Sequence, residues 1–213
     1  MKAVVFSGGE IRNYSAIKKH MEGAKLVICA DSGVRHAFSL GIVPDLIVGD
    51  MDSVSKQDLD LINSKGIKIL TYPIEKDYTD TQLALETARQ KGATKVMVLA
   101  ALGERPDHSL ANILLMVHFK RFGMDVRIAG EDWEMFLLEK DADITGSKGD
   151  ILSLIPITPQ VTGIETEGLY YPLKGETLKI GPARGVSNLF VKDNASIKLK
   201  DGLLIAVKVT FKQ

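Results

Sequence analysis

The feature that most constrains the fold is an alternation of short apolar runs with longer amphipathic stretches. The apolar runs, rich in Val, Ile and Leu, occupy residues 3–6, 26–30, 46–48, 67–72, 96–102 and 126–129. They are continuous rather than alternating, which indicates strands buried on both faces. Helical periods fit the stretches between them, at residues 13–21, 34–40, 57–65, 81–91 and 110–122. This alternation predicts crossover connections and a mostly parallel, covered sheet of the Rossmann-like α/β class.

Glycine marks the ends of several predicted helices. Gly41, Gly66, Gly92 and Gly123 each stand just after the last residue with a helical pattern. A glycine in the left-handed conformation is a common way to end a helix. We therefore expect positive φ angles at these positions.

The pattern changes near residue 135. Beyond residue 137 short β-type runs replace the helical periods, at residues 151–155, 163–166, 178–180, 196–199 and 203–211. Gly, Pro and Asn separate these runs, as in an antiparallel sandwich. We predict an α/β domain over residues 1–135 and a smaller antiparallel β-sandwich domain over residues 136–213. The single tryptophan, Trp133, is expected to pack at their junction.

Composition excludes some classes of function. Lys+Arg and Asp+Glu are balanced at 27 each, without the basic excess typical of a protein that binds nucleic acid, so no such partner is expected. No apolar run approaches the roughly 20 residues of a membrane span, so no membrane association is expected. Cys29 lies in an apolar run, where a buried core thiol is favoured. A lone cysteine suits a reducing compartment, and we expect a cytoplasmic protein.

The loops after the predicted strands contain most of the chemistry. Ligands of an open parallel sheet bind beyond the carboxyl ends of its strands, so these loops meet at one edge. They span residues 7–9, 30–33, 49–53, 75–80 and 102–108, and four of the five contain carboxylates. Gly8 and Gly9 in the first loop would let the backbone approach a ligand closely.

Carboxylates that converge on one edge raise one another's pKa unless a cation lies between them. Mg²⁺ prefers oxygen ligands and usually accompanies substrate phosphates, so the pattern indicates a Mg²⁺-dependent phosphorus-transfer enzyme. Asp50 and Asp52 are the sharpest pair, because residues i and i+2 of an extended segment point the same way. The alternative is that one of them only forms a turn or caps a helix.

Asp80 has two interpretations. Thr79 and Gln82 match a capping box, which puts Asp80 in the first turn of a helix, where the helix dipole favours an anion. The same position directs Asp80 to the ligand edge. We therefore keep both a structural and a ligand-binding role, and favour the second.

The remaining polar residues of these loops also have structural alternatives. Asp31 is either a pocket residue or the N-cap of the helix that follows it, and Asp107 is a candidate cap of the helix at residues 110–122. Arg105 suits a phosphate, which its guanidinium can bind with two parallel hydrogen bonds. His108 is favoured as a first-turn residue over a catalytic base.

Several familiar motifs are missing from the sequence. There is no G-x-x-x-x-G-K-[ST] phosphate loop and no G-x-G-x-x-G dinucleotide fingerprint. Histidine and cysteine are too few for a zinc site. A P-loop enzyme, a dinucleotide cofactor and a zinc enzyme are therefore not indicated.

Taken in order, the motifs resemble those of the thiamine pyrophosphokinases. The matching segments are Ala30-Asp31-Ser32-Gly33, Gly49-Asp50-Met51-Asp52-Ser53, Lys76-Asp77-Tyr78-Thr79-Asp80, Arg105-Pro106-Asp107-His108, Gly168-Leu169-Tyr170-Tyr171-Pro172-Leu173 and Gly185-Val186-Ser187-Asn188. Each motif alone is weak, whereas six in the same order and spacing are specific. The resemblance covers nearly the whole chain.

The resemblance implies an activity that composition could not. The family transfers a pyrophosphoryl group from ATP to the hydroxyethyl oxygen of thiamine, giving thiamine diphosphate and AMP, with Mg²⁺ as cofactor. It implies an α/β catalytic domain, a β-rich thiamine-binding domain and a homodimer. Thiamine would then lie between the α/β domain of one subunit and the β domain of the other.

Carried over position by position, the resemblance assigns roles to residues. Asp50, Asp52 and Asp80 correspond to the Mg²⁺ ligands. The nucleotide pocket would comprise Gly8, Gly9, Asp31, Ser32, Gly33, Gly103, Arg105, Asp107 and His108. Thiamine would contact Asp77, Tyr78, Thr79, Tyr171, Ser187 and Asn188. The catalytic carboxylates would be Asp50, Asp52, Asp77, Asp80 and Asp107, with either Asp77 or Asp107 accepting the hydroxyl proton.

Tyr171 departs from part of the family. It stands where some members carry a tryptophan that stacks on thiamine. A tyrosine ring there would still stack, with altered strength.

Two other functions compete with this interpretation. A Mg²⁺-dependent phosphohydrolase would use the same aspartates with water, but it leaves Tyr171 and the Ser187-Asn188 segment without a role. A non-catalytic binding module would use the β domain for recognition, and its aspartates would only cap helices. The first predicts phosphate or pyrophosphate release without thiamine, and the second predicts no Mg²⁺-dependent ATP binding.

Overall fold

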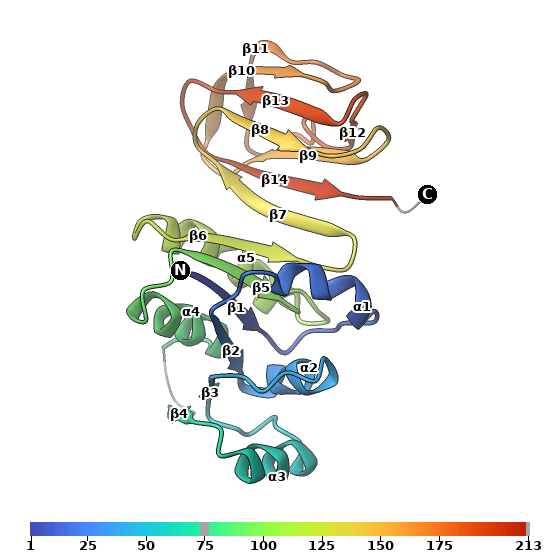
Figure 1. Ribbon diagram of the computed structural model, residues 1–213. Coiled ribbons are helices and arrows are strands. Elements are labelled where there is room, and N and C mark those ends of the chain that lie inside the picture. Colours follow the sequence, from blue (N-terminus) through green and yellow to red (C-terminus); the bar gives the residue numbers. More distant parts are fainter. Residues whose placement is uncertain (73–76, 212–213) are drawn as a thin grey trace. The chain divides into compact units, whose positions relative to one another are not determined.

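The computed structural model describes residues 1–72 and 77–211 and divides the chain into two compact units (Figure 1). Unit 1 spans Met1–Glu131 and unit 2 spans Asp132–Gln213. The division therefore falls a few residues before the boundary expected from the sequence.

Unit 1 is built on a parallel sheet. Its strands are β1 (Lys2–Phe6), β2 (Leu26–Ala30), β3 (Leu46–Gly49), β4 (Ile69–Thr71), β5 (Lys95–Leu99) and β6 (Asp125–Ala129). They pair in the order β6-β5-β1-β2-β3-β4, and every pair is parallel. The interior residues of β1, β2, β3 and β5 are almost all buried, which confirms the prediction of a covered parallel sheet.

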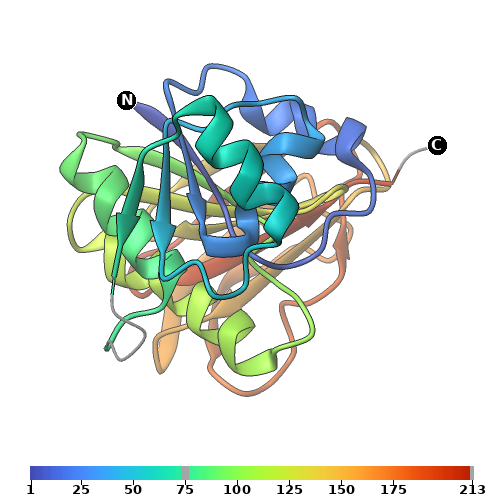
Figure 2. The same cartoon turned by 90° about the horizontal axis from the view of Figure 1, so that it is seen from below.

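Helices cover both faces of this sheet. They are α1 (Tyr14–Ile17), the 3₁₀ turns η1 (Lys18–Met21) and η2 (Asp31–Gly33), α2 (Val34–Ser39), α3 (Lys56–Lys65), α4 (Asp80–Gln90) and α5 (Pro106–Lys120). Figures 1 and 2 show α2 and α3 on one face and α4 and α5 on the opposite face. The chain thus moves outward from β1 to β4 on one side, and then returns beside β1 as β5.

Two predicted helices differ from the structure. The helix expected at residues 13–21 is one α-turn followed by the 3₁₀ turn η1, whose tighter winding accompanies the burial of His20. The helix expected at residues 110–122 begins four residues earlier, at Pro106. Proline suits this first helical position because its missing N–H needs no partner there. The polar residues that follow Pro106 hid the helix from the hydrophobic pattern.

The glycine C-caps are confirmed. Gly41, Gly66, Gly92 and Gly123 have φ angles of 72°, 62°, 83° and 72°. At Gly66 the N–H bonds back to Asn63 at 3.2 Å and closes the helix.

Unit 2 contains two antiparallel sheets. Its strands are β7 (Trp133–Leu138), β8 (Ala142–Thr145), β9 (Ile151–Pro156), β10 (Gln160–Glu167), β11 (Lys174–Lys179), β12 (Asn188–Leu189), β13 (Asn194–Lys198) and β14 (Leu204–Val209). The strands β12-β9-β14-β7 belong to a ten-stranded sheet, and the other sheet has four strands in the order β11-β10-β13-β8. Phe136 and Leu204 of the first sheet share one buried cluster with Ile164 and Ile197 of the second. The predicted sandwich is confirmed, and the described residues after 137 contain no helix.

Nowhere in residues 1–72 and 77–211 is a helix both long enough and apolar enough to cross a membrane.

Two glycines provide a stability test of the close packing in unit 1. A Cβ added at Gly33 would stand 2.2 Å from the Phe6 carbonyl oxygen, so β1 and η2 would have to separate. A Cβ at Gly66 meets nothing within 4 Å, so Gly66→Ala costs only the left-handed strain, about 1–2 kcal/mol. We expect Gly33→Ala to lower the melting temperature more than Gly66→Ala, measured by circular dichroism. Equal shifts would contradict the close approach.

Candidate active site

A cavity lies at the switch point of the unit 1 sheet. The neighbouring strands β1 and β5 lead to connections on opposite faces, and ligands of α/β sheets bind in the crevice that this reversal creates. A cavity of about 410 Å³ opens there, which we call the switch-point cavity. It is lined by Ser7, Gly8, Gly9, Glu10, Arg35, Thr81, Ala100, Ala101, Gly103, Glu104, Arg105, His108, Ser109 and Asn112.

The loop after β1, residues 7–9, forms one wall of this cavity, and we call it the glycine loop. The Ser7 N–H donates to Leu99 and the Gly9 N–H to Ala100, at 2.9 and 2.8 Å. A Cβ at Gly9 would stand 2.5 Å from the Ala100 carbonyl oxygen, so only glycine allows this approach. The Ser7 hydroxyl lies 2.7 Å from that of Thr81, which ties the loop to α4.

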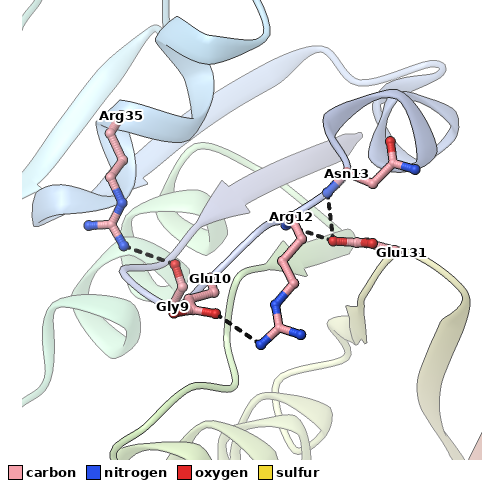
Figure 3. A network of polar contacts seen from close by, with 6 residues as sticks. All are labelled: Gly9, Glu10, Arg12, Asn13, Arg35 and Glu131. Atoms are coloured by element: carbon pink, nitrogen blue, oxygen red, sulfur yellow. Dashed lines mark hydrogen bonds and ion pairs between the residues drawn. The ribbon is translucent and has the colours of Figure 1, made fainter.

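Charged side chains hold this segment at two further points (Figure 3). Arg35 donates from its guanidinium to the Gly9 carbonyl at 2.9 Å. Glu131 accepts from the backbone N–H groups of Arg12 and Asn13, each at 2.7 Å. The chain after β1 is therefore fixed within the cavity wall at Gly9 and again a few residues later at Arg12 and Asn13.

A second cavity adjoins the first and contains the aspartates. We call this space of about 660 Å³ the acidic cavity. It is lined by Gly8, Ala30, Asp31, Ser32, Asp50, Asp52, Ser53, Asp77, Tyr78, Thr79, Asp80, Thr81, Arg105 and His108. Gly8, Thr81, Arg105 and His108 line both cavities. A ligand could therefore extend from the glycine loop to the carboxylates.

Three carboxylates form the acidic cluster, which comprises Asp31, Asp50 and Asp52. One oxygen of each lies within 4.8 Å of the others. Asp31 is buried, with 7% of its surface exposed, whereas Asp52 is exposed. The sequence placed Asp31 in the nucleotide pocket. The structure brings it into direct proximity with Asp50 and Asp52.

Asp31 is held in an unusual state. Its φ angle is 46°, a left-handed conformation that a residue other than glycine rarely adopts. One carboxylate oxygen accepts from the Ser53 hydroxyl. The other, Oδ1, is buried without a hydrogen-bond partner among the described residues. The alternative that Asp31 caps the following helix is wrong, because the residue before α2 is Gly33 and Asp31 makes no capping bond.

Asp50 and Asp52 are brought together by a turn. We expected an extended segment, but Met51 has a left-handed φ angle of 66°. The Asp52 N–H donates to Asp50 Oδ1 at 3.2 Å, so Asp50 also forms the turn. The side-chain hydrogen bond with Asp50 raises the pKa of Asp52, and the charge of Asp50 raises it further. The negative charges of the acidic cluster therefore repel one another.

Asp80 lies beside the acidic cluster. The predicted capping box is confirmed, since the Thr79 hydroxyl accepts from the Gln82 N–H at 3.2 Å and Asp80 lies in the first turn of α4. A Cβ at Gly49 would come within 3.3 Å of Asp80 Oδ1 and 3.0 Å of the Asp31 Cβ. Gly49 therefore leaves room for both aspartates close to its backbone.

Asp77 and Tyr78 line the same acidic cavity and are exposed. The other part of this predicted loop, Glu75 and Lys76, lies outside the described residues. The loop after β4 thus brings one further carboxylate to the acidic cavity.

Arg105 and Asp107 form a two-point ion pair at the start of α5. Arg105 donates to both carboxylate oxygens of Asp107, at 3.0 and 2.6 Å. This hydrogen bonding lowers the pKa of Asp107. The prediction that Asp107 caps α5 is wrong, because the helix begins at Pro106 and Asp107 lies in its first turn. His108 is confirmed as a first-turn residue.

Arg105 and His108 line both cavities, whereas Asp107 is absent from the described linings of either. Gly33 is likewise absent from them, and its role is the close packing against β1 described above. The structure therefore separates residues that face the cavities from residues that support them.

Unit 2 has a cavity of its own, which we call the aromatic cavity, of about 430 Å³. It is lined by Leu154, Tyr170, Tyr171, Pro172, Leu173, Arg184, Gly185, Val186 and Asn188. The rings of Tyr170 and Tyr171 meet edge to face, with centroids 4.8 Å apart, and both are exposed.

Asn188 holds the backbone of Tyr171 at two points. Its Oδ1 accepts from the Tyr171 N–H at 2.9 Å, and its Nδ2 donates to the Tyr171 carbonyl at 2.7 Å. Ser187 lies next to it with a φ angle of 61°, and its N–H donates to the Ser153 hydroxyl. Within the described lining, Asn188 faces the cavity and Ser187 does not.

Sequence reasoning missed several site residues. Ser53 and Thr81 stand within or beside the quoted motifs, but a hydroxyl in a loop or first turn carries no signal of its own. Arg35 looked like an ordinary charged residue of a surface helix. Its role depends on the approach of α2 to the glycine loop, which no local pattern encodes.

The fold and the site together define a class of enzyme. A parallel α/β sheet with a glycine loop at its switch point and clustered carboxylates beside it is typical of a transferase that acts on phosphate esters. The aromatic cavity of unit 2 suits a second, planar ligand.

Comparison with known proteins identifies the family. The family model described as "Thiamin pyrophosphokinase, catalytic domain" matches residues 17–128, and that described as "Thiamin pyrophosphokinase, vitamin B1 binding domain" matches residues 137–204. The chain belongs to the thiamin pyrophosphokinase family.

Individual relatives agree with this assignment. A thiamine pyrophosphokinase of Bacillus subtilis is 26% identical over 214 residues, covering 99% of this chain and 100% of the relative. Thiamine pyrophosphokinase 1 of Arabidopsis thaliana is 26% identical over 216 residues, covering 88% and 79%. The crystal structure of a Bacillus subtilis thiamine pyrophosphokinase matches the whole of both chains with a TM-score of 0.90 at 23% identity. Yeast thiamin pyrophosphokinase matches with a TM-score of 0.78 at 18% identity, covering 98% and 86%.

Repulsion in the acidic cluster predicts a stability gain on neutralising it. The pKa of Asp52 is raised in the folded protein, so the cost of its charge is absent below the unfolded pKa, about 4, and fully present above the folded pKa. In EDTA at pH 7 we expect Asp52→Asn to melt at a higher temperature than the wild type. The difference should shrink as the pH falls through the raised pKa of Asp52 and vanish below about 4.

The control for this measurement is Asp60→Asn, at an exposed position on α3. Its melting temperature should match that of the wild type. A melting temperature of Asp52→Asn at or below the wild-type value at pH 7 would contradict the repulsion.

Proposed function

We propose that this chain transfers the pyrophosphoryl group of ATP to thiamine, using unit 1 for the nucleotide and unit 2 for the acceptor. Family membership makes the chain a thiamine pyrophosphokinase, and the two family models correspond to a catalytic and a vitamin B1 binding domain. The observation that carries the proposal at residue level is the acidic cluster beside a glycine-lined cavity. One buried oxygen of Asp31 in this cluster has no hydrogen-bond partner among the described residues.

The nucleotide phosphates fit the switch-point cavity. Gly8 and Gly9 allow the backbone to approach them closely, since neither has a side chain in the way. Arg105 lines both cavities and carries a positive charge at their junction. Its pairing with Asp107 fixes the orientation of the guanidinium, so Asp107 acts as a positioning residue for a phosphate-binding arginine.

The acidic cluster fits a hard divalent cation such as Mg²⁺. Its donors are all carboxylate oxygens, which Mg²⁺ prefers, and Asp31 Oδ1 accepts no hydrogen bond from the described part of the chain. Asp31, Asp50 and Asp52 would hold the ion, with Asp80 beside them. When bound, the cation would offset phosphate charge and the mutual repulsion of the aspartates.

The reaction exchanges one phosphorus–oxygen bond for another. The hydroxyl oxygen of thiamine attacks the β-phosphorus of ATP, and the bond from that phosphorus to the α–β bridging oxygen breaks. AMP leaves with this oxygen, and the product keeps the β- and γ-phosphates. Alignment and charge neutralisation supply most of the rate enhancement in such transfers.

The hydroxyl proton requires a base, and Asp77 is the better of the two candidates. Both oxygens of Asp107 accept from Arg105, which lowers the Asp107 pKa and makes it a poor proton acceptor. Asp77 lines the acidic cavity and is exposed.

Thiamine fits the aromatic cavity of unit 2. Its rings are planar and one is cationic, so the faces of Tyr170 and Tyr171 suit it. Asn188 contributes by holding the Tyr171 backbone and by lining the cavity. A tyrosine at position 171 can therefore serve where a tryptophan stands in some relatives.

A homodimer is part of the proposal. The acidic cluster belongs to unit 1 and the aromatic cavity to unit 2, so transfer requires the two kinds of site to meet. Two chains could supply one of each to a shared active site. Sedimentation equilibrium would then give twice the chain mass of 23.3 kDa.

The activity itself is tested by incubation with ATP, Mg²⁺ and thiamine, followed by chromatography. Wild-type protein should produce equal amounts of AMP and thiamine diphosphate. Asp52→Asn should lose turnover by several orders of magnitude while keeping its circular dichroism spectrum, because it lacks one charge of the cluster. Asp60→Asn, which changes a carboxylate on α3 instead, should keep wild-type turnover.

Three results would count against the proposal. Substantial turnover by Asp52→Asn would contradict the metal assignment. Release of phosphate or pyrophosphate from ATP without thiamine would favour a phosphohydrolase. Absence of Mg²⁺-dependent ATP binding would favour a non-catalytic binding module.

The thiamine cavity has its own test. Tyr171→Ala should raise the KM for thiamine by about tenfold, because an aromatic contact and its buried area are lost. Tyr171→Phe keeps the ring and should remain within about threefold of the wild type, and neither change should alter the KM for ATP. Equal KM values for thiamine in all three proteins would contradict the assignment.

A further inference from the structure

Two consecutive residues of α2 hold the carbonyl groups of the glycine loop. One nitrogen of the Arg35 guanidinium, Nη2, donates to the Gly8 carbonyl at 2.6 Å and to the Gly9 carbonyl at 2.9 Å. His36 Nε2 lies 2.8 Å from the same Gly9 carbonyl. Figure 3 shows the Arg35 side chain reaching from its helix to the Gly9 carbonyl. The Gly9 oxygen thus accepts two hydrogen bonds.

The state of His36 follows from its partners. A carbonyl can only accept, so Nε2 carries a hydrogen and donates it to Gly9. Nδ1 lies 2.9 Å from the Tyr14 hydroxyl. Burial lowers the pKa of His36, which is 2% exposed, and the charge of Arg35 also lowers it. The ring is therefore neutral near pH 7, and its Nδ1 accepts from Tyr14.

These hydrogen bonds fix the direction of the glycine-loop carbonyls relative to a ligand in the switch-point cavity. Carbonyl oxygens repel phosphate oxygens, whereas N–H groups attract them. The peptide between Gly9 and Glu10 is planar and trans, so a carbonyl directed to α2 points the Glu10 N–H the opposite way. Arg35 itself lines the switch-point cavity, where it adds a positive charge.

A purely structural role for Arg35 is the competing explanation. An arginine that only stabilised the surface would be expected to pair with a carboxylate, but no ion pair of Arg35 occurs in the described part of the chain. Its strongest partners are instead two carbonyls of a cavity wall, with a weaker contact of 3.5 Å to Ser32. Because the charged guanidinium of Arg35 donates to carbonyls of the cavity wall, we relate its role to the ligand of the switch-point cavity.

We propose that Arg35 and His36 are positioning residues that keep the glycine-loop carbonyls turned to α2, so that the loop receives the polyphosphate of the nucleotide. Tyr14 completes this carbonyl clamp by fixing the ring of His36. The inference rests on the proposed function, because it assigns the nucleotide to the switch-point cavity. It concerns nucleotide binding alone and leaves the thiamine cavity of unit 2 unaffected.

The test is the steady-state kinetics of Arg35→Met with both substrates varied. Loss of two charge-assisted hydrogen bonds should raise the KM for ATP about tenfold or more, while the KM for thiamine stays within about twofold. Arg35→Lys keeps the charge but lacks the fork, and its KM for ATP should fall between those of the wild type and Arg35→Met. Tyr14→Phe removes only the hydroxyl and should raise the KM for ATP about threefold.

Arg12→Met is the matched control. Arg12 stands close to the glycine loop in sequence, but its guanidinium reaches Glu10 at 3.4 Å, and its side chain is 86% exposed. Because only its backbone N–H is held by Glu131, this variant should keep both wild-type KM values.

The possible results distinguish a failure of the proposed function from a failure of the carbonyl clamp. A wild-type chain that forms no thiamine diphosphate would overturn the proposed function. Active wild-type protein with an unchanged KM for ATP in Arg35→Met would overturn only the carbonyl clamp. Equal increases in both KM values, or full restoration by Arg35→Lys, would also overturn it. If Arg35→Met fails to fold, Arg35→Lys and Tyr14→Phe decide by the same criteria.

Discussion

The candidate active site of unit 1 is built on the convergence of carboxylates at the carboxyl edge of its parallel sheet. Asp31, Asp50 and Asp52 bring oxygens within 4.8 Å of one another, and one buried oxygen of Asp31 has no hydrogen-bond partner in the described chain. Buried polar atoms in this state are rare and costly. A left-handed backbone at Asp31 adds to the cost. Such an arrangement is explained when a cation and a phosphate ester occupy the edge.

Residues around the acidic cluster shape the two cavities at this edge of the sheet. Gly9 and Gly33 allow backbone contacts that a side chain would block, so the loops after β1 and β2 pack closely. Arg105 carries positive charge to the junction of the two cavities, held by Asp107. In the aromatic cavity, which we propose for thiamine, the amide of Asn188 fixes the backbone of Tyr171. Asp107 and Asn188 thus each hold a residue that lines a cavity.

Features that restrict the residue type at nearby positions could be predicted from the sequence. Continuous apolar runs located the buried parallel strands, and glycines such as Gly66 located helix ends, because burial on both faces and left-handed backbone each restrict the residue type. The start of α5 at Pro106 was missed, since its first turn is polar. The roles of Asp31 and Arg35 were beyond local patterns. Both depend on segments distant in the chain, namely the Ser53 hydroxyl and the glycine-loop carbonyls.

In the proposed mechanism the acidic cluster, including Asp31, binds one divalent cation. Isothermal titration of Mg²⁺ into the wild-type chain with a non-hydrolysable ATP analogue measures this binding, once the heat of the same titration into the analogue alone is subtracted. We expect saturable binding that Asp31→Asn weakens at least about tenfold, since the buried carboxylate would lose its charge. Indistinguishable titrations of the two proteins, or no heat in either, would contradict it.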